Sequence, residues 1–106
     1  MKPISEKRQA QLKEYYALVV KLSRWCHNRS ELSGNRPTEW QAGFRVVPHH
    51  ILGRRGKQLL NPFNIIMVTH TEHTAIHEER SPYTKEQLLE IVKTLRIKQG
   101  FKVNNA

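Results

Sequence analysis

Apolar side chains recur at helical spacing along the first quarter of the chain. Across residues 4–28 they stand mostly three or four positions apart, at Leu12, Tyr15, Tyr16, Val19, Leu22 and Cys26. This spacing aligns them on one face of a helix, while the basic residues fall largely on other faces. Ser5 is suited to cap the first turn, because its hydroxyl can accept a backbone hydrogen bond. The pattern predicts a long amphipathic helix over residues 4–28.

The pattern changes after this segment. Residues 29–43 are rich in turn formers, and two short β-prone runs follow, FRVVPHHI at 44–51 and NIIMV at 64–68. We expect these runs to pair as a hairpin, with residues 52–63 as a long loop between them. Pro48 has no backbone N–H to donate, which suits the edge or end of a strand.

Two capping boxes predict the remaining helices. Each pairs a threonine with a Glu or Gln three residues later, at Thr69 with Glu72 and at Thr84 with Gln87. The first of these helices should begin near His70 and end before Ser81, because the residue ahead of a proline avoids helical geometry. The second ends at Gly100. Its apolar stripe consists of Leu88, Ile91, Val92 and Leu95.

A hairpin followed by a helix, with a helix before and after the unit, predicts the α+β class. A chain of 106 residues is enough for one domain. We expect that domain to span 1–106, with a helical N-terminal part at 4–43, the hairpin and its helix at 44–80, and a last helix at 84–99.

Cysteine count and hydropathy exclude several classes of protein. The one cysteine, Cys26, allows neither an intramolecular disulfide nor a cysteine-based zinc site. No apolar run approaches the roughly 20 residues of a membrane helix, and the N-terminus lacks the apolar stretch of a signal peptide. These features predict a cytoplasmic protein that does not act in a membrane.

Charge adds an indication of the partner. Eighteen basic against nine acidic residues give a net charge of +9 and a pI near 10.1. The excess lies at the two ends, and residues 37–83 are nearly neutral. A pI above about 9 is typical of nucleic-acid-binding domains, although a basic surface also serves solubility alone.

Five of the six histidines lie between positions 49 and 77. His49 and His50 are adjacent at the end of the first β-prone run, and His70, His73 and His77 share one face of the following helix. Imidazole is the commonest side-chain metal ligand and also a general base near neutral pH. Two histidines four residues apart on a helix can reach one ion together.

These segments resemble the HNH endonuclease signature, which lies on the ββα-metal fold. The resemblance rests on PHHI, the Gly/Arg loop, NPFNIIMV and HTEHTAIH, within residues 44–80. The steps are fourteen residues from His50 to Asn64, nine from Asn64 to His73 and four from His73 to His77. They are similar to the intervals of the nuclease-colicin branch of the family.

The resemblance implies a role for each matching residue. His49 and His73 would bind a metal, and His50 would be the general base. Asn64 would tie the loop back and hold the base in orientation. His77 would be a further ligand or a phosphate contact. His70 is not expected in the site, except as a substitute ligand if the register differs.

The implied activity is metal-dependent hydrolysis of phosphodiester bonds in double-stranded DNA, nicking one strand with low sequence specificity. One divalent ion is expected, with Mn²⁺ as the first choice and Mg²⁺, Ni²⁺, Zn²⁺ or Co²⁺ as alternatives. Arg54, Arg55 and Lys57 would grip the phosphate backbone, or are ordinary loop charges. The Cys-x-x-Cys pairs of many family members are absent, so the flanking helices must stabilise the fold.

Three alternatives stay open on the sequence. The chain is compatible with a non-catalytic, metal-stabilised nucleic-acid-binding domain, or with a nuclease subunit that is active only beside a partner chain. A basic helical interaction protein with incidental histidines leaves the His-His pair and the spacing unexplained. The oligomeric state is open.

Overall fold

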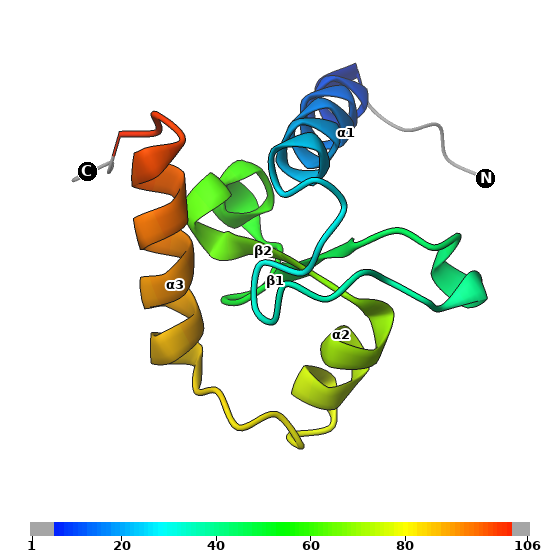
Figure 1. Cartoon of the computed structure of the whole chain (residues 1–106). Coiled ribbons are helices and arrows are strands. Elements are labelled where there is room, and N and C mark those ends of the chain that lie inside the picture. Colours follow the sequence, from blue (N-terminus) through cyan, green and yellow to red (C-terminus); the bar gives the residue numbers. More distant parts are fainter. Residues whose placement is uncertain (1–5, 103–106) are drawn as a thin grey trace.

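The computed structural model describes residues 6–102, and within them the predicted α+β class is confirmed (Figure 1). Helices and strands follow one another as α1 (Glu6–Trp25), β1 (Val47–His50), β2 (Ile65–Val68), α2 (His70–His77) and α3 (Lys85–Lys98). Three short 3₁₀ turns lie at Trp40–Ala42, Gly56–Leu60 and Pro62–Asn64. The predicted cap at Ser5 lies outside the described residues. No helix in the described part is long and apolar enough to cross a membrane.

The two strands form an antiparallel sheet at the centre of the molecule. All four residues of β2 are fully buried, and alternation along the strand directs them into two cores. Ile65 and Met67 pack with residues of α1, while Ile66 and Val68 pack with residues of α3. The small sheet is therefore covered on both faces, with helices far apart in sequence on opposite sides (Figure 1).

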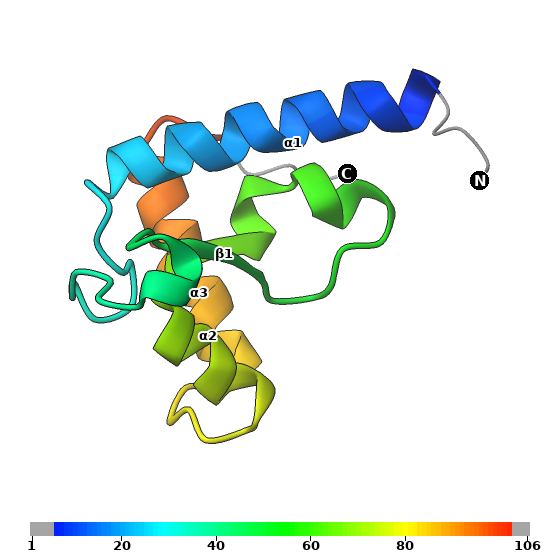
Figure 2. The ribbon, with the colours of Figure 1, turned by 90° about the vertical axis from the view of Figure 1, so that its right-hand side faces the viewer.

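Helix α1 runs over the 3₁₀ turn at Gly56–Leu60 (Figure 2). Tyr15 and Leu22 are its buried residues, one on each side of the partly buried Val19. The predicted apolar face was wrong at Tyr16, which is 62% exposed. The helix ends at Trp25, so the N-terminal segment up to residue 43 continues as turns rather than as helix.

Both capping boxes are confirmed, because each threonine hydroxyl accepts from the backbone N–H of its Glu or Gln partner, and that partner's side chain accepts from the threonine N–H. Helix α2 ends at His77, before Ser81 as predicted. Glu79 then adopts a left-handed backbone with φ of 57°, which turns the chain toward α3.

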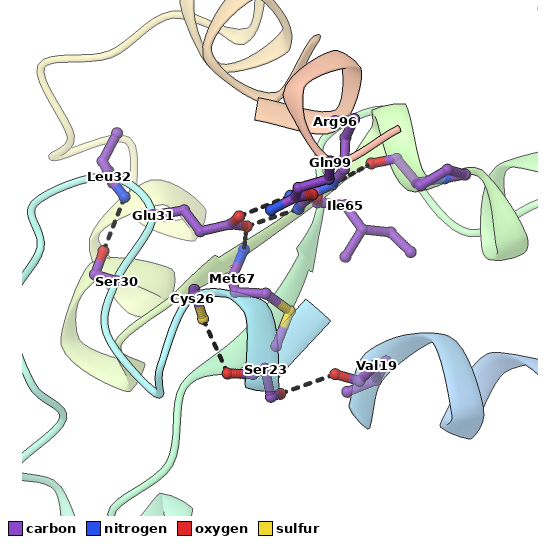
Figure 3. A network of polar contacts seen from close by, with 11 residues as sticks. Val19, Ser23, Cys26, Ser30, Glu31, Leu32, Ile65, Met67, Arg96 and Gln99 are labelled. Carbon is purple, nitrogen blue, oxygen red and sulfur yellow. Dashed lines mark hydrogen bonds and ion pairs between the residues drawn. The ribbon is translucent and has the colours of Figure 1, made fainter. Parts of the chain in front are cut away.

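A buried arginine joins α3 to β2 and to the segment after α1 (Figure 3). Arg96 is fully buried, and its guanidinium donates to both carboxylate oxygens of Glu31 at 2.6 and 2.7 Å. It also donates to the carbonyls of Pro62 and Ile65 and to the side chain of Gln99. All five of its donor hydrogens thus have acceptors, the condition under which a buried guanidinium is tolerated.

Glu31 also completes the free edge of β2. Its N–H donates to the Met67 carbonyl at 2.7 Å, and its carboxylate accepts from the Met67 N–H at 2.8 Å. Met67 is the residue that faces Pro48 in β1. Because the backbone groups of Met67 bond to Glu31, the missing N–H of Pro48 costs no hydrogen bond between β1 and β2.

Candidate metal centre

Strand alternation separates the two adjacent histidines of β1. The His49 ring lies 5.2 Å from that of His73 and 5.4 Å from that of His77, both on α2. The His50 ring lies on the α1 side, 5.6 Å from the ring of Tyr15. Successive side chains of a strand point to opposite faces, so His49 faces α2 and His50 faces α1.

His49, His73 and His77 form a cluster able to hold a metal ion. One nitrogen from each ring lies within 4.8 Å of the other two. Ligand nitrogens of a tetrahedral zinc ion, with bonds of about 2.0–2.1 Å, stand about 3.4 Å apart. The three nitrogens therefore lie close enough together to bind one ion. His70, the substitute ligand, is not in this cluster.

The environment of the cluster favours neutral imidazoles, the form that binds a cation. Burial, together with the nearby His73 and His77 rings, lowers the pKa of His49 from its ordinary value of 6.5 to about 4. Burial and His77 likewise lower the pKa of His73. Nδ1 of His49 and Nδ1 of His73 are buried and have no hydrogen-bond partner within residues 6–102. Neutral, buried and unpartnered imidazole nitrogens fit a bound divalent ion.

His50 has a different environment. Burial and the Arg54 guanidinium lower its pKa, and a hydrogen bond with the backbone of Leu59 opposes them. Its Nε2 is buried and has no partner in the described part of the chain. Because Nε2 has no partner, we assign the Leu59 interaction to Nδ1, which makes Nε2 the basic nitrogen.

Asn64 is 1% exposed and ties the long loop to the start of β2. Its side-chain oxygen accepts from the Leu52 N–H at 2.7 Å, and its amide donates to the carbonyls of Gly53 and Gln58 at 2.9 and 3.1 Å. Gln58 directly precedes Leu59, whose backbone contacts His50. Asn64 and His50 are thus joined through the loop rather than by direct contact.

The three loop cations separate in space. Arg54, Arg55 and Lys57 are all exposed. Arg54 lies over the Tyr15 ring, 5.3 Å from its centre, on the same side as His50. Lys57 lines a different hollow, together with Lys102. The structure therefore places Arg54 beside His50, and Lys57 in the lining of a different hollow.

A hollow of about 420 Å³ opens beside the cluster. Its lining includes His49, His50 and His77 together with Ser81, Tyr83 and Lys85, which come from the α2–α3 connection and the start of α3. No motif in the sequence predicted that these last three residues lie at the site. The one sequence feature that could have indicated them is that they flank Thr84, the N-cap residue at which the chain returning from α2 begins α3.

Comparisons with protein-family models, with curated proteins and with solved structures gave no match. The candidate site therefore stands on its own geometry: three imidazoles able to share one ion, a fourth with a free basic nitrogen, and an adjoining hollow.

Proposed function

We propose that this protein is a metal-dependent endonuclease of the HNH type, with a ββα-metal core formed by β1, β2 and α2, that hydrolyses phosphodiester bonds in double-stranded DNA. The observation that carries the proposal is the cluster of His49, His73 and His77 next to His50. The basic chain supports a polyanionic substrate. The three histidines of the cluster all belong to the segments that resemble the HNH signature.

His49, His73 and His77 would hold one divalent ion, and Mn²⁺ is the proposed working ion. When bound there, such an ion supplies Lewis-acid stabilisation of the negative charge that builds on phosphate oxygens. Three imidazoles alone favour Zn²⁺, Ni²⁺ or Co²⁺ over Mg²⁺ in affinity. Three protein ligands also leave room for substrate, as in catalytic rather than closed structural sites.

His50 is the proposed general base. Nε2 takes a proton from the attacking water as the water's oxygen bonds to phosphorus. The bond from phosphorus to the leaving 3′ oxygen breaks, and that oxygen takes up a proton from solvent. Leu59 holds the ring by its backbone, and Asn64 holds the loop that carries Leu59. Asn64 is thus a positioning residue in this proposal.

One such centre acts on one strand. We therefore propose that the single chain nicks duplex DNA, and that Arg54, beside His50, contacts the backbone near the reacting phosphate. The described residues hold no separate recognition module, so low sequence specificity is expected.

Cleavage of supercoiled plasmid tests the proposal. The purified protein is incubated with plasmid in EDTA, Mg²⁺, Mn²⁺, Ni²⁺ and Zn²⁺, beside His50→Ala and the control His70→Ala, a histidine of α2 outside the cluster. Metal-dependent open circles, lost in EDTA, reduced about 10²-fold in His50→Ala and kept in His70→Ala, support it. Linear product without a nicked precursor would overturn single-strand cutting.

The main alternative predicts a different outcome. A metal-stabilised binding domain would retard the plasmid and leave it intact with every ion. A subunit that needs a partner chain would likewise be inactive alone, and would gain activity in the complex.

A further inference from the structure

We propose that Lys85, assisted by Tyr83, binds a phosphate of the DNA substrate in the hollow that these two residues line together with His49, His50 and His77. This inference rests on the proposed function, because it names where the substrate backbone lies at the same site. It adds two residues from the connection to α3 that lie outside the histidine motif.

The first support is the shape of the site. The hollow of about 420 Å³ falls within the range of roughly 300–1,000 Å³ of ligand sites. Ile51, Ile76 and Leu88 supply its apolar lining. His49, which is 7% exposed and has an unpartnered Nδ1, belongs to the same lining. A substrate group in this space is bordered both by the histidines and by the start of α3.

The second support is an uncommitted cation. Lys85 is exposed, and its side chain makes no hydrogen bond or ion pair with any residue of the described part. Lys85 lines the same hollow as His49. A lysine ammonium beside a cavity is a common phosphate partner, because it is a compact charge with three donors.

The third support is the local backbone and its neighbour. Lys85 is the first residue of α3, a helix of 14 residues whose N-terminal end carries partial positive charge. Tyr83 lies two residues earlier on the same rim, 41% exposed, and its hydroxyl has no partner within residues 6–102. Lys85, the Tyr83 hydroxyl and the end of the helix together offer charge and donors to one anion.

Glu79 is the acidic residue of the lining and opposes this attraction. The two charges of the hollow therefore make opposite predictions. Neutralising Lys85 weakens DNA binding, whereas neutralising Glu79 strengthens it. Lys93 and Glu90, both exposed on α3 and outside the hollow, provide charge-matched controls.

The test measures binding without cleavage. A fluorescein-labelled 20-base-pair duplex is titrated in EDTA at several salt concentrations and followed by fluorescence anisotropy. Each phosphate contact contributes about 0.9 to the slope of log K against log salt. Lys85→Gln should weaken binding about tenfold at low salt and reduce the slope by about 0.9, and Glu79→Gln should tighten binding. Tyr83→Phe should weaken binding with the slope unchanged.

The controls decide the outcome. If Lys93→Gln matches Lys85→Gln in affinity and slope, or if Glu90→Gln matches Glu79→Gln, the effects are those of net charge and the proposal is overturned. Thermal unfolding of each variant checks that the fold is retained. Because binding is read in EDTA, a protein that never cleaves DNA can still support the phosphate site, and an active nuclease can still refute it.

Discussion

Replacing Arg96 tests the way this fold is stabilised without Cys-x-x-Cys zinc pairs. Arg96→Met keeps most of the aliphatic volume and removes the guanidinium. It leaves the Glu31 carboxylate, whose side chain is 3% exposed, as a buried charge without its counter-ion. The carbonyls of Pro62 and Ile65 lose their donors in the same step. Breaking a buried ion pair in this way costs about 3–5 kcal/mol.

That loss is a large part of a typical domain stability of about 5–15 kcal/mol. At about 4–8 °C per kcal/mol for a small domain, Tm should fall by at least about 12 °C. Urea unfolding followed by circular dichroism in EDTA measures the free energy directly. Lys98→Met, an exposed cation of the same helix, is the matched control and should change stability by less than about 0.5 kcal/mol.

A double mutant separates the charge from the contacts. Glu31→Gln with Arg96→Met buries no charge and still offers Met67 a side-chain acceptor. We expect the double variant to be more stable than the sum of the two single changes predicts, by about 0.5–3 kcal/mol. An Arg96→Met protein within about 1 kcal/mol of wild type, or strictly additive single changes, would refute the reasoning.

Three further predictions follow from the site. Asn64→Ala removes the three hydrogen bonds of a buried side chain, so the free energy of unfolding should fall by about 1–3 kcal/mol. Nicking should slow, whereas the affinity for Mn²⁺ measured by calorimetry should change little. In EDTA, the free energy of unfolding should decline as pH falls from about 6.5 toward about 4. The pKa of His49 is about 4 in the folded protein and 6.5 in the unfolded chain, so the unfolded chain binds more protons in that window. Urea unfolding at several pH values should show this decline, and the decline should be weaker in His49→Leu. Zn²⁺ should raise Tm in wild type and less in His73→Ala, and equal shifts would argue against the cluster as the binding site.

The parts of the fold that local chemistry determines could be predicted from the sequence. Thr69 and Thr84 begin their helices as expected, because a capping box lies within four residues of chain. The strand pair and the convergence of His49 with His73 and His77 also agree with the prediction. Tyr16 was misplaced because helical spacing gives a face but not its width.

The parts that depend on distant contacts could not be predicted. Arg96 reads locally as a cation in the last turn of a helix, yet its partner Glu31 is 65 residues away. Lys85 reads as a surface charge until the connection from α2 brings it to the hollow. Neither position carries a local pattern that distinguishes it from the other lysines and arginines of a basic chain.

The nicking rate as a function of Mn²⁺ concentration tests the central claim most directly, because it separates a metal ligand from a general base. His73→Ala should shift the half-saturating Mn²⁺ concentration upward by about tenfold or more, with activity partly recovered at high metal. His50→Ala should lower the plateau about 10²-fold at an unchanged half-saturating concentration. A curve for His50→Ala that coincides with wild type, or no nicking by wild type at any Mn²⁺ concentration, would contradict the account.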